Sequence, residues 1–523
     1  MARSGPRRSR SPRYPVNLVD VRPNVLLVTL DQFRGDCLSF HGHPVVRTPH
    51  LDALAREATV LSRHYSQAAP CSPGRASLYT GMYLMNHRVC FNGSPLDHSF
   101  DNVARVARRH GYAPALFGYT DQGVDPRVTE SAADPRLSTY QGVLPGFDWL
   151  LDLSEPYTPW LAHLRDHGHT IADHITALTS EPDRDESLSI SSFLTDHFLT
   201  WLESRPASAT NTNGHPADAP WFAHLSYLRP HPPYAAAGKW SQEYDPAKVD
   251  LPIAPSDDRH GFHEAVMQLP DTRAPRTEAG MRRMRAQYYG MIGEVDSQLG
   301  RIFSVLRNRG DWENTIVVIT ADHGEQLGDH GLREKVGFFE QSYHIVGMVR
   351  APQFDAGHGR VVDAFTENVD ILPTLCDLIG APVPSQCDGR SLLPWLNGDT
   401  PTDWRDAATW EYDWRQLYIT DQPDGSAVNW PHDRRLERQH LCVQRNHSSA
   451  YVQFGNGDWL AFDLATDPTW RTPIQNAELV LPLAQRMLTW RSQHAHRELS
   501  GLKLEDGGIG RWPDRVPWRS VSN

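Results

Sequence analysis

PNVLLVTLDQ, residues 23–32, is an unbroken apolar run that ends in an acid and an amide. Valine and leucine side chains on both faces are typical of a strand buried in a parallel sheet. The run therefore predicts a central strand over residues 23–30 that delivers Asp31 and Gln32 at its carboxyl end. Ligands bind outside the carboxyl ends of strands in open α/β sheets, so these two side chains are candidates for a binding site.

Three further apolar runs repeat this pattern. They cover residues 114–118, 221–228 and 315–320. The polar residues that follow them are Tyr119-Thr120-Asp121, Arg229-Pro230-His231-Pro232-Pro233 and Ala321-Asp322-His323-Gly324. Because the carboxyl ends of parallel strands meet at one edge of a sheet, one site can collect the ends of all four strands.

A long helix and a second sheet complete the expected fold. Apolar residues at helical spacing predict an amphipathic helix over residues 279–308 that packs on the sheet. After residue 385, short segments rich in β-formers alternate with Gly, Asp and Pro, which predicts a small antiparallel sheet. These segments are ATWEYDW, LCVQ, AYVQF and WLAFDL.

Composition and charge exclude several classes of protein. The chain has 523 residues and a formal net charge of −12, which argues against a nucleic-acid-binding protein. No apolar run approaches the roughly 18 residues that span a membrane. The leader, MARSGPRRSRSPRYP, is basic without an apolar segment, so it does not resemble a secretion signal, and a transit peptide is the alternative. Six scattered cysteines fit reduced thiols, and we expect a cytoplasmic protein.

Two pairs of side chains have the chemistry of metal ligands. Asp31 with Gln32, and Asp322 with His323, each follow an apolar strand. Oxygen ligands with one imidazole suit a divalent cation such as Ca²⁺, Mg²⁺ or Mn²⁺, and an open coordination position would hold an anion. The alternative for either pair alone is a helix cap or a turn.

The segment CSPGRASLYTG, residues 71–81, carries the most specific signal in the chain. Taken alone, Cys71 could be a small buried hydrophobic residue, as most free cysteines are. With Pro73, Arg75 and Gly81, however, it resembles the signature by which sulfatases have their active-site cysteine converted to formylglycine. That maturation requires a formylglycine-generating enzyme as a partner.

The resemblance extends over residues 22–500. It is carried by GMYLMNHRVCFNGSPLD, ALFGYT, YLRPHPPY, DHGEQLGDHGLREKVG, CDGRSLLPWL and EYDWR. These segments are similar to the phosphonate monoester hydrolase and arylsulfatase branch of the formylglycine sulfatases, in the alkaline phosphatase superfamily. The resemblance implies an α/β fold: an α/β/α sandwich with a smaller C-terminal antiparallel-sheet domain. It also implies an oligomer, plausibly a homotetramer, assembled partly through the C-terminal tail.

Four segments follow from this assignment. We expect a disordered basic leader at 1–21, a catalytic α/β domain at 22–385, a C-terminal α+β subdomain at 386–500 and a tail at 501–523 that could act as an oligomer arm.

The resemblance also implies a role for each candidate residue. The metal ligands that it implies are Asp31, Gln32, Asp322, His323 and Cys71, the last as formylglycine, around one divalent cation (Ca, Mn or Mg). Cys71 would supply the nucleophile and Arg75 would steady it. The positions that would hold the anionic group or protonate the leaving oxygen are Asn92, Tyr119, His231 and Lys335.

Two of these positions have competing interpretations, and so does Asp121, the third candidate substrate-binding residue beside Asn92 and Tyr119. His231 could be a turn histidine between prolines, and Lys335 could be a solvated loop lysine, although the chain has only four lysines. Asp121 stands where relatives tend to carry threonine, and a carboxylate facing the site would repel a dianion. We expect Asp121 either to turn away from the substrate or to select substrates with a cation or a single negative charge.

The sequence thus predicts a metal-dependent hydrolase that cleaves small anionic esters: sulfate esters, phosphonate monoesters or both, and also phosphodiesters. One alternative is a phosphodiesterase or phosphatase in which Cys71 remains a thiol. Another is a non-catalytic homologue that binds anions through an intact metal site.

Overall fold

The computed structural model describes residues 22–207, 220–415, 438–495, 502–505 and 508–511. Its centre is a sheet of nine strands. In spatial order these are β10 (Val361–Glu367), β2 (Thr59–Tyr65), β9 (Gly347–Arg350), β7 (Thr315–Thr320), β1 (Asn24–Leu30), β6 (Phe222–Tyr227), β4 (Pro114–Gly118) and β5 (Asp148–Asp152), and β8 (His344–Ile345) pairs with β2. The segment 1–21, for which we expect a disordered basic leader, lies outside the described residues.

Strand β1, formed by the apolar run at residues 23–30, lies in the middle of this sheet. All seven residues of β1 are buried, and β1 pairs in parallel with β6 on one side and with β7 on the other. Its side chains alternate between two hydrophobic clusters, with Leu26 and Val28 in one and Val25 and Leu27 in the other. A strand buried on both faces needs a continuous apolar sequence, which is the pattern of residues 23–30.

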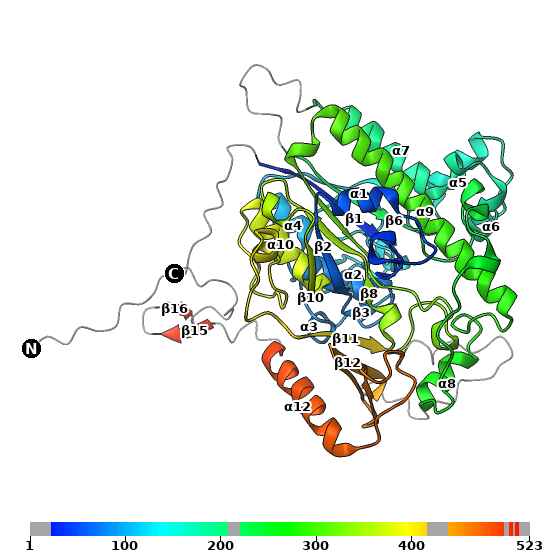
Figure 1. Ribbon diagram of the computed structural model, residues 1–523. Helices are drawn as coiled ribbons and strands as arrows, with labels where there is room; N and C mark the ends of the chain where they lie inside the picture. The colour runs from blue at the N-terminus through cyan, green and yellow to red at the C-terminus, as the bar shows by residue number, and fades with distance from the viewer. Residues whose placement is uncertain (1–21, 208–219, 416–437, 496–501, 506–507, 512–523) are drawn as a thin grey trace, which may run out of the picture.

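Helices cover both faces and make three layers (Figure 1). One cluster joins the sheet to α1 (Pro49–Ala55), α5 (Thr158–Asp166), α6 (His174–Thr179), α7 (Ile190–Glu203) and α9 (Glu278–Arg309). The other joins it to α2 (Cys71–Thr80), α4 (Val103–Arg109), α10 (Ile371–Ile379) and α11 (Leu393–Leu396). The predicted α/β/α sandwich is therefore confirmed, and the long helix predicted at 279–308 is α9.

A second, smaller sheet lies beside the first. Its strands, in order, are β14 (Trp459–Asp463), β13 (Ser449–Phe454), β12 (His440–Asn446), β11 (Ala407–Asp413) and β3 (Ala68–Ala69). The first four are antiparallel, as the sequence predicted, and β3 joins the edge in parallel. This last pairing ties the second sheet to the segment that leads directly into α2.

Besides short 3-10 helices, three α-helices and a hairpin remain among the described residues. They are α3 (Leu84–His87), α8 (Gly261–Gln268), α12 (Ala477–His494) and a hairpin of β15 (Leu502–Glu505) and β16 (Gly508–Arg511). In the described part of the chain, no helix is both long and apolar enough to cross a membrane. Apart from this hairpin, the tail at 501–523, and with it the expected oligomer arm, lies outside the described residues.

Candidate active site

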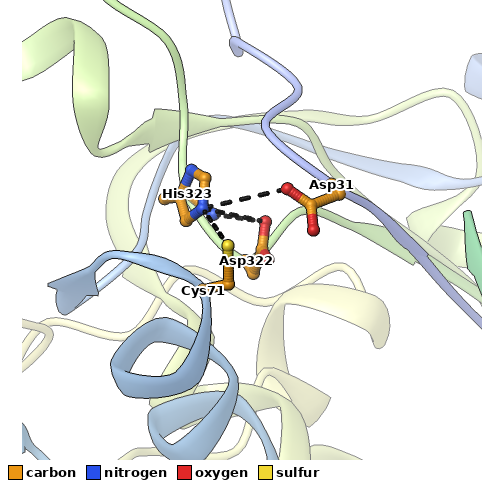
Figure 2. A group of neighbouring side chains, drawn as sticks. All are labelled: Asp31, Cys71, Asp322 and His323. Carbon is orange, nitrogen blue, oxygen red and sulfur yellow. Dashed lines mark hydrogen bonds and ion pairs between the residues drawn. The ribbon is translucent and has the colours of Figure 1, made fainter. Parts of the chain in front are cut away.

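The ends of two central strands and the start of α2 meet at one point (Figure 2). Asp31 follows β1, Asp322 and His323 follow β7, and Cys71 is the first residue of α2. One ligand atom from each of these four buried side chains lies within 4.8 Å of the others. Sequence positions up to 292 residues apart thus form a compact group, because neighbouring parallel strands end at the same edge of the sheet.

Arg75 holds the two carboxylates of this group together. Its side chain is fully buried, with Nη2 donating to Oδ2 of Asp31 and Nε to Oδ2 of Asp322, both at 2.9 Å. Nη1 donates to Oγ of Ser226 at 2.7 Å and to the carbonyl of Tyr119 at 3.2 Å. The planar guanidinium therefore fixes two acidic side chains from two strands in one geometry.

These donors fit a divalent cation. Oδ1 of Asp31 is buried and has no hydrogen-bond partner among the described residues. Burial alone would raise the pKa of Asp31, but His231, Arg75 and His323 hold it well below its usual value. A buried, ionised carboxylate with a bare oxygen, next to a second aspartate and an imidazole, is a set of oxygen and nitrogen donors that Ca²⁺, Mn²⁺ or Mg²⁺ can use.

Cys71 lies directly against His323. Its Sγ is 3.3 Å from Nε2 of His323. Burial, together with the charge of Asp31, raises the pKa of the Cys71 thiol well above its usual value. An unmodified Cys71 in this environment is therefore a neutral thiol near neutral pH, which is a poor nucleophile.

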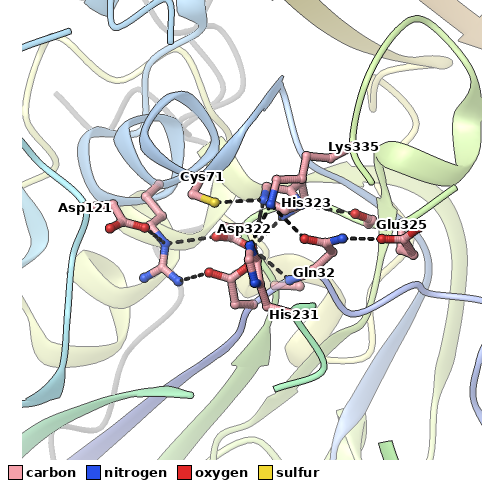
Figure 3. Close-up of polar contacts among 12 residues, drawn as sticks. Gln32, Cys71, Asp121, His231, Asp322, His323, Glu325 and Lys335 are labelled. Carbon is pink, nitrogen blue, oxygen red and sulfur yellow. Dashed lines mark hydrogen bonds and ion pairs between the residues drawn. The ribbon is translucent and has the colours of Figure 1, made fainter. Parts of the chain in front are cut away.

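His231 and Lys335 meet on the other side of the group (Figure 3). Nζ of Lys335 donates to Nε2 of His231 and to Oε1 of Gln32, each at 2.8 Å. Nδ1 of His231 lies 2.7 Å from the carbonyl oxygen of Pro232. Because a carbonyl can only accept, Nδ1 carries the imidazole proton, and Nε2 is the acceptor. His231 does lie in a turn between two prolines, since its backbone N–H donates to the carbonyl of Leu228 at 2.9 Å. Lys335 is buried, so the solvated-loop alternative for it is wrong.

The charge states follow from this geometry. Burial and the neighbouring ammonium lower the pKa of His231. Burial alone would lower the pKa of Lys335, but Cys71, Glu334 and Asp31 raise it well above its usual value. Lys335 is thus the protonated member of the pair, and His231 is neutral.

The three expected substrate-binding residues also border this group. Oδ1 of Asn92 accepts the backbone N–H of Ser72 at 2.9 Å, in the first turn of α2. The Tyr119 hydroxyl donates to Oδ2 of Asp31 at 2.7 Å, and its ring lies under Arg75. Both therefore support other site residues, and their expected contacts with the substrate remain predictions.

Asp121 is buried beside Arg75 and does not turn away to solvent. Its Oδ2 is 3.4 Å from Nε of Arg75, and its Oδ1 has no hydrogen-bond partner in the described part of the chain. Burial, with Asp31 and Asp322 nearby, raises the pKa of Asp121 to about 7, although Arg75 acts in the opposite direction. A carboxylate therefore borders the group on the Arg75 side, opposite Lys335 (Figure 3).

Sequence reasoning missed several supporting residues. Glu325 and Glu334 bind the side chain of Gln32, and Arg229 binds the loop that carries His231. Ser226, the penultimate residue of strand β6, accepts a hydrogen bond from Arg75. Glu325 and Glu334 stand inside the segment DHGEQLGDHGLREKVG, where two acids near a candidate metal ligand were a usable signal.

Comparison with known proteins decides the family. Residues 23–381 match the family described as Sulfatase. The chain belongs to the sulfatase family. This sulfatase-family chain is 34% identical to the multifunctional alkaline phosphatase superfamily protein PehA of Trinickia caryophylli, over 93% of this chain and 99% of that protein.

Solved structures agree with this assignment. The phosphonate monoester hydrolase of Agrobacterium radiobacter is 39% identical, with a TM-score of 0.84, over 94% of this chain and all of that one. The phosphonate monoester hydrolase of Silicibacter pomeroyi is 33% identical, with a TM-score of 0.81, over 95% of this chain and all of that one. The predicted family and fold are confirmed, and this sulfatase-family protein is a hydrolase of sulfate or phosphonate esters.

Proposed function

We propose that this enzyme cleaves sulfate esters and phosphonate monoesters, and also phosphodiesters, through a formylglycine made from Cys71 and one divalent cation. The observation that best supports this proposal is the position of Cys71. It begins α2 within the motif Cys-x-Pro-x-Arg, and its Sγ shares a 4.8 Å group with donor atoms of Asp31, Asp322 and His323. A nucleophile derived from this residue would sit at the metal.

The cation would be held by Asp31, Gln32, Asp322 and His323 together with residue 71. When present, the cation supplies a Lewis acid, and formylglycine supplies a hydrated aldehyde whose hydroxyl is the nucleophile. Arg75 keeps the carboxylates of Asp31 and Asp322 in place through its two 2.9 Å contacts. The substrate anion would be drawn to the charges of the cation and Lys335.

We assign Lys335 to protonate the leaving oxygen, because a bound cation would offset the charge of Asp31 that helps to raise the pKa of Lys335. It carries protons on Nζ, while Nε2 of the neutral His231 accepts one of its hydrogen bonds at 2.8 Å. His231 therefore orients the ammonium through this hydrogen bond. General acid catalysis of this kind contributes a factor of roughly 10² to 10⁴ to rate.

The proposal extends to maturation, location and assembly. It requires a formylglycine-generating enzyme that acts on the segment 71–75 and a small anionic ester as substrate. We place the enzyme in the cytoplasm as a homo-oligomer, with a catalytic domain at 22–385 and a C-terminal subdomain at 386–500. The six scattered cysteines, which fit reduced thiols, support the location.

The test is the ratio of kcat/KM for an aryl sulfate and an aryl phosphonate monoester with the same leaving group, on metal-loaded enzyme. Mass spectrometry of the Cys71 peptide is measured on the same preparation, and Cys71→Ala serves as the background. We expect an aldehyde at residue 71 and activity on both esters that the variant lacks. Full activity with an unmodified thiol would overturn the formylglycine mechanism, and conversion without turnover would overturn the enzymatic one.

A further inference from the structure

The side-chain amide of Gln32 is held from both ends (Figure 3). Its Nε2 donates to Oε2 of Glu325 and, at 3.3 Å, to Oε2 of Glu334. Its Oε1 accepts a hydrogen bond from Nζ of Lys335 at 2.8 Å. A carboxylate can only accept and an ammonium can only donate, so only one of the two amide orientations satisfies all three contacts.

Hydrogen bonds also fix the backbone of Gln32, as they fix its side chain. Its φ is 70°, in the left-handed region that residues with a Cβ rarely adopt. Its N–H donates to Oδ1 of Asp322 at 3.1 Å, and its carbonyl accepts the hydroxyl of Tyr288 at 2.6 Å. Such a conformation persists where surrounding contacts determine it, and in this protein they aim the side chain toward the end of β7.

Both carboxylate oxygens of Glu325 accept hydrogen bonds. Its Oε1 accepts the backbone N–H groups of Leu327 at 2.7 Å and Glu334 at 2.8 Å, while Oε2 accepts from Gln32. Both oxygens of this buried side chain therefore face donors only. An amide at position 325 would have to place its NH₂ against one of these donors.

We propose that Glu325 and Glu334 are positioning residues that turn the amide oxygen of Gln32, rather than its nitrogen, toward the cation site. The inference rests on the metal site of the proposed function. It also explains the neutral amide at position 32, because a carboxylate there would face the carboxylates of Glu325 and Glu334. The two glutamates thereby make an amide act as a metal ligand without adding another negative charge.

The test is the affinity of metal-free protein for Mn²⁺, measured by competition with a chromophoric chelator. Glu325→Gln places a donor against a donor, so we expect the dissociation constant to rise at least roughly tenfold, the loss of one well-oriented ligand. Glu411→Gln is the matched control, because Glu411 is also buried and accepts a backbone N–H, from Met85, but lies in the second sheet. Circular dichroism verifies the fold of each variant.

A double variant shows whether Glu325→Gln acts through the orientation of the Gln32 amide or through a general loss of structure. In the double variant Gln32→Glu with Glu325→Gln, the amide and the carboxylate exchange places, so the contact between positions 32 and 325 again joins a donor to an acceptor. Only Glu334 then still faces a carboxylate at position 32, so the recovery is expected to be partial. We expect this variant to recover at least half of the lost affinity on a logarithmic scale. If Glu325→Gln does not fold, Glu334→Gln carries the test, with a smaller expected loss.

The outcomes are distinct. Wild-type affinity in Glu325→Gln, or a double variant weaker than that single variant, would overturn this inference while leaving the metal site intact. A wild-type protein that binds no divalent cation would overturn the metal site of the proposed function and this inference with it.

Discussion

Oδ2 of Asp121 lies 3.4 Å from Nε of Arg75, the same nitrogen that donates to Asp322 at 2.9 Å. One buried guanidinium is therefore surrounded by three carboxylates, since Asp31 contacts Nη2. Arg75 alone cannot neutralise all three, and since Asp31 and Asp322 would also bind the cation, Asp121 is the carboxylate left without a second counter-charge. The charge carried by the substrate is then part of what the site recognises.

This relationship predicts a preference for singly charged esters. With Asp121→Asn, we expect the kcat/KM ratio of an aryl phosphonate monoester over the matching aryl phosphate to fall roughly tenfold, because a dianion no longer meets the extra carboxylate. Assays at about pH 8.5 keep Asp121 ionised, since its pKa is about 7. Asp363→Asn removes one exposed charge elsewhere and should leave the ratio unchanged. An unaltered ratio in Asp121→Asn would show that Asp121 does not select substrate charge.

Lys335→Ala is predicted to lower kcat/KM most for esters that have poor leaving groups. A leaving alkoxide needs a proton, whereas a nitrophenolate leaves without one, so the loss in kcat/KM should grow with the pKa of the leaving alcohol. We expect roughly a hundredfold loss for a phenyl ester and a smaller loss for the nitrophenyl ester. The measurement is the slope of log kcat/KM against leaving-group pKa, with Lys239→Ala, which changes an exposed lysine, as the control. Equal losses across the series would remove the general-acid role from Lys335.

Acid destabilisation is predicted at a buried histidine that is not a proposed metal ligand. Burial lowers the pKa of His224 to about 3, where its Nε2 meets the hydroxyl of Tyr79 and its Nδ1 the carbonyl of Leu27. Below the unfolded pKa of about 6.5, the unfolded chain takes up a proton that the folded chain does not, so stability falls as pH falls. Between pH 7.5 and 5 this site should cost about 2 kcal/mol.

A comparison of wild type with His224→Gln isolates the contribution of His224 to the pH dependence of stability. Denaturant unfolding of wild type and His224→Gln at both pH values should show a smaller acid-induced loss in the variant, although the variant is less stable overall. Parallel losses in the two proteins would assign the acid sensitivity to other groups.

Strand-end residues were predictable from sequence because the information was local. Apolar runs before Asp31 and Asp322 indicate central parallel strands, and parallel strands bring their carboxyl ends to one edge. The group around Cys71 then required the family resemblance, since nothing in a helix start alone places it beside His323. Strand pattern and signature together predicted four residues that the structure brings into one group: Asp31, Cys71, Asp322 and His323.

The supporting contacts could not be predicted in the same way. Glu325 reaches Gln32 across 293 positions of sequence, through a loop without periodicity. Likewise, the bond from Asn92 to Ser72 depends on how the segment after α3 returns to α2. Such contacts depend on the conformation of loops. Residue type and spacing do not determine a loop conformation, because many conformations are compatible with one loop sequence.

Arg229 offers a last prediction, because it tethers the loop that carries His231. Its fully buried side chain donates from Nη1 to the carbonyls of His231 at 2.8 Å and Pro233 at 3.0 Å, and from Nε to Glu181 at 3.1 Å. Lysine offers one ammonium and cannot span these acceptors, so Arg229→Lys should let His231 shift relative to Lys335. A displacement of that kind is expected to lower kcat roughly tenfold or more.

A double-mutant cycle shows whether Arg229 acts through His231. In the His231→Ala background, Arg229→Lys should cost almost nothing further in kcat for a phenyl ester, because the positioned side chain is already gone. Additive losses would mean that Arg229 supports the fold in general rather than His231. Melting temperatures of the four proteins identify that case, since a general role would lower the stability of Arg229→Lys equally in both backgrounds.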